Sequence, residues 1–132
     1  MGCAEWNYRG HSNRIFSVKF IDDNSLVSGG WDSVLHQWDL RVGKSVRAVF
    51  GPHVAGDAID FRGNELLVGC YAAKNQLQLW DYNKFEMREG ISWTSSEEKD
   101  RVAYVYTATF QYLFQYLLVR VCPILLWLVH AG

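Results

Sequence analysis

The chain has no excess of charge of either sign. Its 132 residues include 13 Lys and Arg and 14 Asp and Glu, which gives a formal net charge of −1, and the basic residues are scattered. Nucleic-acid-binding domains usually carry a basic patch or stripe, because they neutralise phosphates. The sequence therefore gives no reason to expect a nucleic-acid partner.

Cysteine and metal-ligand patterns are also scarce. The cysteines are odd in number and widely spaced: Cys3, Cys70 and Cys122. The histidines show no ligand spacing among themselves or with the cysteines: His11, His36, His53 and His130. A disulfide scaffold needs paired cysteines, and zinc sites need short, regular Cys and His spacings. We expect no metal or other cofactor, and a reducing compartment such as the cytoplasm or nucleus.

Short catalytic motifs are missing as well. The sequence contains no G-x-S-x-G, no Walker loop and no G-x-G-x-x-G, and it does not begin like a secretory signal peptide. The sequence therefore indicates neither an enzyme with a small-molecule substrate nor a secreted protein.

What the chain does contain is an internal repeat. His11 and His53 stand 42 positions apart, as do Trp38 and Trp80. The stretch from Leu26 to Arg41 has two short β-prone runs on either side of Gly, Asp and Ser residues, which favours strand, tight turn and strand. The period of 42 residues falls in the range of propeller blades.

The motifs of this repeat suggest a family. Gly10-His11, the turn residue Asp32 and Trp38-Asp39 form a GH…D…WD pattern, and here the sequence resembles the WD-repeat (WD40) family. The resemblance implies an all-β, partial WD40-type β-propeller within residues 1–111, with blades at about 10–50 and 51–93 and a third beginning at 103–110. Because a ring usually takes ~4 to 8 blades, we expect an open arc.

Strand limits follow from the local pattern. Ile15, Val18 and Phe20 alternate with polar residues, which predicts a half-buried first strand with an early bulge. In the second repeat, we expect the outer strand at residues 82–87 and a long polar loop at residues 88–101.

Residues 112–132 depart from the repeat. Of all the charged residues, only Arg120 lies after Arg101, and residues 112–129 contain no Gly, Asn, Asp or Ser to turn the chain. The turn rules therefore predict no blade here. A membrane span at residues 112–129 is possible by length, although Arg120 at its middle would cost ~2.5 to 3.5 kcal/mol and Pro123 follows. An unrelated segment, such as an alternative-exon product, is favoured, and a degenerate strand pair is the third interpretation.

The resemblance also implies a hydrogen-bond tetrad in the first repeat: His11, Ser28, Asp32 and Trp38. Asp32 would accept from the His11 ring and fix its tautomer, and Ser28 would bond both His11 and the Trp38 indole. We interpret the set as structural, because a serine inside a strand has neither a nucleophile elbow nor oxyanion donors.

In the second repeat, a shift of 42 positions gives the equivalent residues His53, Cys70, Lys74 and Trp80. Only a partial tetrad of His53, Cys70 and Trp80 is expected there, since the Ser and Asp are lost.

Two groups of residues are candidates for partner binding. The resemblance places Arg14, Phe16 and Trp31 on the face formed by the strand-end loops, and aromatic and Arg side chains are enriched at binding hot spots. The alternative is that Phe16 packs in the core and Trp31 is a tolerated turn residue. Their counterparts in the second repeat, residues 55, 57 and 73, are Ala, Asp and Ala.

The second group is Trp38-Asp39-Leu40-Arg41. It resembles the motif by which some WD-repeat proteins dock on the adaptor of cullin-RING ubiquitin ligases as substrate receptors. The alternative is that Arg41 only pairs with Asp39 or solvent, which is worth ~0 to 1 kcal/mol at a surface.

Taken together, these patterns predict a non-catalytic protein–protein interaction scaffold from a truncated WD-repeat protein. A ligase receptor and a membrane-anchored fragment are the alternatives. Unpaired blade edges also predict self-association.

Overall fold

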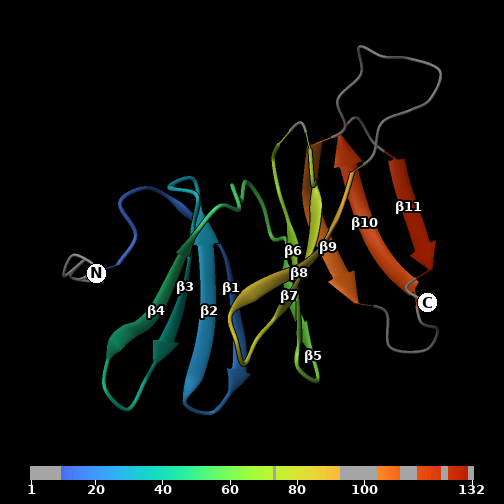
Figure 1. Ribbon diagram of the computed structural model, residues 1–132. Coiled ribbons are helices and arrows are strands. Elements are labelled where there is room, and N and C mark those ends of the chain that lie inside the picture. Colours follow the sequence, from blue (N-terminus) through green and yellow to red (C-terminus); the bar gives the residue numbers. More distant parts are fainter. Residues whose placement is uncertain (1–9, 73, 93–103, 111–115, 123–124, 131–132) are drawn as a thin grey trace.

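The computed structural model describes residues 10–72, 74–92, 104–110, 116–122 and 125–130. Within these residues the regular structure is entirely β, arranged as three antiparallel sheets that stand side by side (Figure 1). Each sheet is a meander of strands that follow one another in sequence, because short turns join antiparallel neighbours. The chain thus repeats one simple unit, as the sequence predicts.

The first two sheets are the two predicted blades. The first contains β1 (Ile15–Asp22), β2 (Ser25–Gly30), β3 (Val34–Asp39) and β4 (Lys44–Phe50). The second contains β5 (Ile59–Arg62), β6 (Glu65–Gly69), β7 (Leu77–Asp81) and β8 (Glu86–Ile91). Both have four strands in sequence order. This confirms the all-β, open-arc fold.

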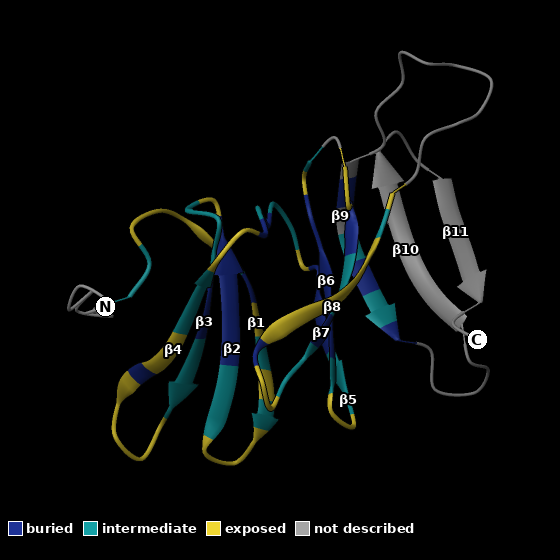
Figure 2. Ribbon diagram, viewed as in Figure 1, coloured by how far each residue is buried: buried dark blue, intermediate teal, exposed yellow. Residues whose placement is uncertain are grey.

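The core lies between the sheets rather than inside any one of them (Figure 2). Alternation along β6 sends Leu66 and Val68 toward the first sheet and Leu67 toward the third, and all three are fully buried. The sheets approach closely at Gly69, where an added Cβ would lie 2.6 Å from Val105 Cγ1. A central blade is therefore held by apolar contacts on both of its faces.

The first strand differs from the sequence prediction in what it buries. The expected bulge is present between Ile15 and Ser17. However, Val18 and Phe20 are 49% and 63% exposed, whereas Ser17 is buried and its hydroxyl donates to Asp57 Oδ1 at 3.0 Å. The apolar series of β1 thus lies on the side that faces away from the second blade.

The outer strand of the second blade begins later than predicted. The expected strand at residues 82–87 and the loop from 88 were wrong, because residues 82–85 form a turn and β8 continues to Ile91. Asp81 holds this turn by accepting the backbone N–H of Lys84 at 3.1 Å. Phe85 lies in this turn with a φ of 56° and is buried. A buried apolar residue in a turn has the same sequence pattern as one in a strand, which explains the wrong prediction.

The third sheet corrects the interpretation of residues 112–132. It contains β9 (Tyr104–Phe110), β10 (Tyr116–Cys122) and β11 (Leu125–His130), in the order β11-β10-β9. The turn rules were wrong to predict no blade strands here, and of the three interpretations the degenerate strand pair is the one that the pairing of β10 with β11 supports. The Leu, Val, Tyr and Trp residues of the tail favour strands once a partner strand is present. Among the described residues no helix is long and apolar enough to cross a membrane.

The sequence also favours an outer strand of a preceding blade at residues 3–9, which lie outside the described residues. For β10 and β11 the structure describes only the backbone, and strand pairing places β10 between β9 and β11.

Candidate functional site

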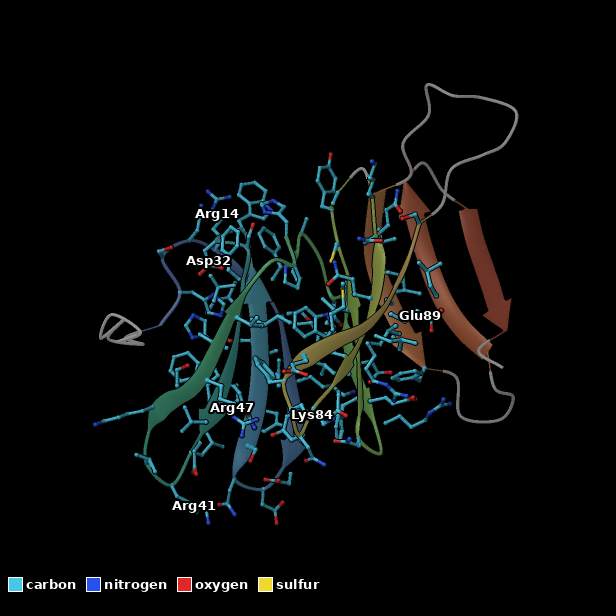
Figure 3. All side chains as sticks on the ribbon, in the orientation of Figure 1. Arg14, Asp32, Arg41, Arg47, Lys84 and Glu89 are labelled. Atoms are coloured by element: carbon cyan, nitrogen blue, oxygen red, sulfur yellow. The ribbon has the colours of Figure 1, made fainter. Side chains whose placement is uncertain are left out.

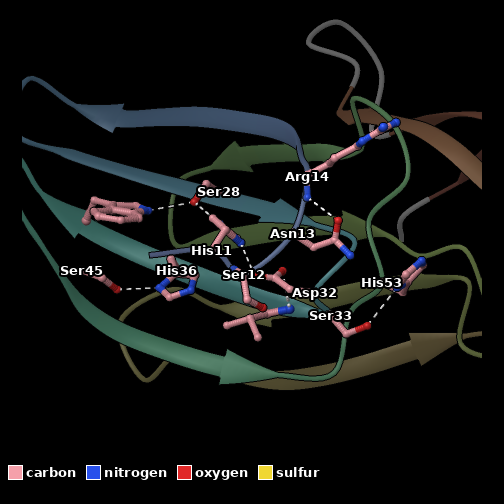
Figure 4. A network of polar contacts seen from close by, with 12 residues as sticks. His11, Ser12, Asn13, Arg14, Ser28, Asp32, Ser33, His36, Ser45 and His53 are labelled. Carbon is pink, nitrogen blue, oxygen red and sulfur yellow. Dashed lines mark hydrogen bonds and ion pairs between the residues drawn. The ribbon is translucent and has the colours of Figure 1, made fainter. Parts of the chain in front are cut away.

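The four tetrad residues of the first repeat meet in one network (Figure 4). The His11 ring donates from Nδ1 to Asp32 Oδ2 at 2.7 Å, and its Nε2 accepts from the Ser28 hydroxyl at 2.7 Å. The Trp38 indole N–H donates to Ser28 Oγ at 2.8 Å. This chain of bonds joins the segment before β1 to β2, to the β2–β3 turn and to β3.

The surroundings of the tetrad favour a structural role. The side chains of His11 and Asp32 are 2% and 3% exposed, and Asp32 also accepts the backbone N–H groups of Ser12 and Val34. Ser28 is buried, and its hydroxyl serves at once as donor and acceptor within the network. A serine in this state is inaccessible as a nucleophile.

A second buried histidine lies against the first. The ring centroids of His36 and His11 are 4.4 Å apart, and His36 Nδ1 bonds Ser45 Oγ at 2.8 Å. Burial lowers the pKa of His36, and the neighbouring His11 lowers it further, while Asp32 acts in the opposite direction. Ligand atoms of His11, Asp32 and His36 lie within 4.8 Å of one another, but both His11 nitrogens are already bonded, which favours the polar network over a metal site.

The partial tetrad predicted for the second repeat does not form. Strand pairing places Ser28 opposite His36, and the corresponding pair in the second blade is Val68 with Gln78. Val68, not Cys70, therefore occupies the serine position. The Trp80 indole instead donates to Gln78 Oε1 at 3.0 Å.

The cause is that the two repeats are not offset by the same number of positions along the whole blade. Relative to the first repeat, β6 is shifted by 40 positions, and the loop after β6 is two residues longer, since Gly29 pairs with Leu35 but Gly69 with Leu77. The constant shift of 42 was thus wrong for β6. Cys70 is a buried free thiol, and burial raises its pKa to about 12, although a hydrogen bond from the His53 backbone acts in the opposite direction.

The residues predicted for partner binding lie at the loop end of the first two blades. The Phe16 and Trp31 ring centroids are 5.2 Å apart, and the Arg14 guanidinium carbon lies 5.7 Å from the Trp31 ring centroid. Trp31 is 43% exposed, while Phe16 is half-buried and also packs against the core. The structure thus brings these three residues together.

Two further rings extend this cluster onto the second blade. His53 stacks on Trp31 with centroids 6.4 Å apart and planes 15° apart, and Tyr71 lies 6.4 Å beyond His53. We call Phe16, Trp31, His53 and Tyr71 the aromatic row. Sequence reasoning missed His53 and Tyr71, although with β6 shifted by 40 positions Tyr71 is the counterpart of Trp31.

The loop that carries Trp31 is anchored to both blades. The Trp31 backbone N–H donates to the Arg14 carbonyl at 2.9 Å, and Val54 N–H donates to the Gly30 carbonyl at 3.2 Å. Ser33, whose φ is 59°, bonds His53 Nδ1 through its hydroxyl at 2.9 Å. The row is therefore held in place before any partner arrives.

Arg41 lies at the opposite end of the first blade from Arg14 (Figure 3), and it pairs with Asp39, the last residue of β3. Arg41 donates from Nε and a terminal nitrogen to the two oxygens of Asp39, at 3.2 and 3.0 Å. The same bonds lower the pKa of Asp39. The Arg41 side chain is 71% exposed, and its pair with Asp39 accounts for its position without a partner.

Comparison with curated proteins finds relatives that share part of the chain. Protein tipD of Dictyostelium discoideum is 25% identical over 92 residues, which cover 70% of this chain and 15% of that protein. The ribosome biogenesis protein WDR12 homolog of Chlamydomonas reinhardtii is 30% identical over 80 residues, covering 61% and 18%. A probable E3 ubiquitin ligase complex SCF subunit sconB of Arthroderma benhamiae is 36% identical over 47 residues, covering 36% and 7%. The chain thus spans less than a fifth of the length of these relatives.

Solved structures show the same fold. The β-propeller domain of Cps50 (Swd1) from Myceliophteria thermophila superposes with a TM-score of 0.68 at 21% identity, over 92% of this chain and 37% of that one. The structure of U3-55K gives a TM-score of 0.64 at 16% identity, over 86% and 35%. Comparison with models of known protein families finds no match. The meander blades and these solved structures together show that the described residues form part of a WD40-type β-propeller, and the repeat motifs are similar to those of WD-repeat proteins.

Proposed function

We propose that this chain is a non-catalytic protein-interaction scaffold that binds partner proteins through the aromatic row at its loop end. The observation that carries the proposal is a continuous line of rings across two blades, with Trp31 at 43% and Tyr71 at 36% exposure. Aromatic side chains and Arg dominate binding energy at protein interfaces, because they bury much area and lose little conformational freedom.

The rigidity of the row supports this role. The backbone bonds at Trp31 and Gly30 and the bond between Ser33 and His53 fix the loop on both blades. A surface that is already ordered loses less conformational entropy on binding, so more of the contact energy appears as affinity.

The comparisons supply supporting context. One relative is named as a ribosome biogenesis protein and another as a subunit of a ubiquitin ligase complex. From these names we extend to this chain only the expectation of protein partners. We further propose the cytoplasm or nucleus as its compartment, in keeping with the free thiol of Cys70.

Affinity capture with quantitative mass spectrometry tests the main proposal. Partners retained by the unaltered chain should be lost with Trp31→Ala and Tyr71→Ala. Met87→Ala serves as the control, because Met87 is 48% exposed on β8 and lies outside the row. Equal recovery with all three variants would sink the proposal.

We also propose that a further blade covers the outer face of β1. By strand pairing, Val18 and Phe20 correspond to Ile59 and Phe61, which pack against the first blade. In β1 the same positions are about half exposed or more, so this face has the apolar residues of a blade interface but no blade packed against it among the described residues.

That blade can come from another chain, which would appear as self-association. Light scattering during size-exclusion chromatography should show a smaller species for a Val18→Ser and Phe20→Ser double variant. An unchanged mass would contradict an interface at this face.

A further inference from the structure

The charge beside the aromatic row indicates what kind of partner it fits. Of the four other arginines whose side chains are described, Arg41, Arg62 and Arg88 each lie within 4.0 Å of a carboxylate, and Arg47 donates to the Asn83 carbonyl at 2.6 Å. Arg14 has no such partner among the described residues; instead, its guanidinium lies over the Trp31 ring. A guanidinium held over an aromatic ring by a cation–π contact still has N–H donors that can bind a carboxylate.

Asp32 and Asp57 each accept hydrogen bonds from other residues of the two blades. Asp32 accepts hydrogen bonds from His11 and from two backbone N–H groups, and Asp57 accepts the Ser17 hydroxyl. Among the described residues no carboxylate lies within ion-pair distance of Arg14, so its guanidinium N–H donors stand at one end of the aromatic row without an acidic partner.

The spacing of the row suits an extended segment. Its ring centroids are 5.2, 6.4 and 6.4 Å apart in order from Phe16 to Tyr71. In an extended chain, side chains two residues apart lie on the same face at roughly 6.6 to 6.8 Å. Alternate apolar side chains of an extended peptide can thus rest on successive rings.

From this geometry we infer that Arg14 and the aromatic row together recognise an extended acidic peptide, in which an Asp or Glu lies beside two apolar side chains at alternate positions. The carboxylate binds the edge of the Arg14 guanidinium, and the apolar side chains lie along Trp31, His53 and Tyr71. This inference rests on the proposed function, since it assigns the chemistry of the partner at the same surface.

The test is selection from a phage-displayed library of random twelve-residue peptides on the immobilised full chain. Enriched sequences should share an acidic residue next to an apolar-x-apolar pattern. For the enriched peptides, Arg14→Ala should weaken binding about tenfold or more, because a charge-assisted bidentate contact is lost. Lys84→Ala removes the same charge at the opposite end (Figure 3) and should change the affinity less than twofold.

The outcomes separate the two proposals. If enriched peptides lack acidic residues, or Arg14→Ala has no effect while Trp31→Ala abolishes binding, the acidic-peptide inference is overturned and the binding surface stands. If Trp31→Ala leaves the affinity unchanged, the proposed function fails as well. A selection that enriches no sequence overturns the inference, and partner capture then decides the proposed function separately.

Discussion

Replacing Ser28 with Ala should destabilise the first blade strongly, because one hydroxyl serves two neighbours. The substitution removes the acceptor of the Trp38 indole N–H at 2.8 Å and the donor to His11 Nε2 at 2.7 Å. An unsatisfied buried polar group costs about 1 to 3 kcal/mol. The His11 side chain is 2% exposed, so water cannot readily replace the lost bond, while the indole is less fully buried. We therefore expect a loss of about 2 to 4 kcal/mol.

Urea unfolding followed by tryptophan fluorescence measures this loss. With a slope of about 1.5 kcal/mol/M, the midpoint should fall by roughly 1.3 to 2.7 M. Ser12→Ala is the matched control, because Ser12 is exposed and contributes only its backbone N–H to the network. A Ser28→Ala midpoint within roughly 0.3 M of the control would refute the reasoning.

A double-mutant cycle then isolates the network. If Ser28 and His11 act through their shared bond, His11→Ala combined with Ser28→Ala should cost less than the sum of the two single changes, by about 0.5 to 3 kcal/mol. Additive losses would mean that the two side chains stabilise the blade independently.

Three other perturbations test separate parts of the structure. Folding lowers the pKa of His36, so near and below pH 6.5 the unfolded chain binds more protons than the folded chain. The free energy of unfolding should therefore fall as the pH falls from about 7 toward about 5. Urea midpoints measured against pH should show this slope, and His36→Gln should flatten it. Asp60 accepts the Phe110 backbone N–H at 2.7 Å, so Asp60→Ala should cost about 1 to 3 kcal/mol and speed hydrogen exchange in β9, and unchanged exchange would count against the contact. Gly69→Ala forces a Cβ against Val105 and should cost about 1 to 3 kcal/mol by thermal unfolding, whereas a neutral result would show that the second and third sheets are not closely packed there.

Much of the fold could be predicted because the repeat carries strong local signals. The turn residues around Asp32 fix a tight connection, and the paired landmarks His11/His53 and Trp38/Trp80 fix the blade period. These signals are local, so they can be read from a single sequence. Side-chain alternation was a weaker guide, because the apolar residues Val18 and Phe20 of β1 are exposed while Ser17 is buried.

The alignment of β6 with β2 was harder to predict. It depends on the lengths of the segments on either side of β6, and compensating changes in those lengths leave the spacing of the flanking landmarks unchanged. The landmarks on either side of β6 agree on 42 positions, while the strand between them is shifted by 40 and the following loop restores the count. Because of this offset, Val68 is the structural equivalent of Ser28, and Tyr71 is the equivalent of Trp31, which a constant shift of 42 does not predict. A comparison of Gly29-Gly30-Trp31 with Gly69-Cys70-Tyr71 would have revealed it.

The tail shows a different limit. Residues 116–122 and 125–130 pair with β9 or with one another, although the segment lacks the usual turn residues. Strand formation here depends on a neighbouring strand, which single-sequence turn rules do not detect. The aromatic row is likewise a product of packing, since its residues come from the entry to β1 and from three loops.

The central claim is that partners bind at the aromatic row, and the chain carries its own reporters for it. NMR spectra of the full chain, with Trp31→Phe used to assign the Trp31 indole, should be recorded with a peptide enriched in the library selection. The account predicts that the Trp31 indole signal shifts on binding while the buried Trp80 indole does not. A shift confined to Trp80, or none at Trp31 at saturating peptide, would contradict it.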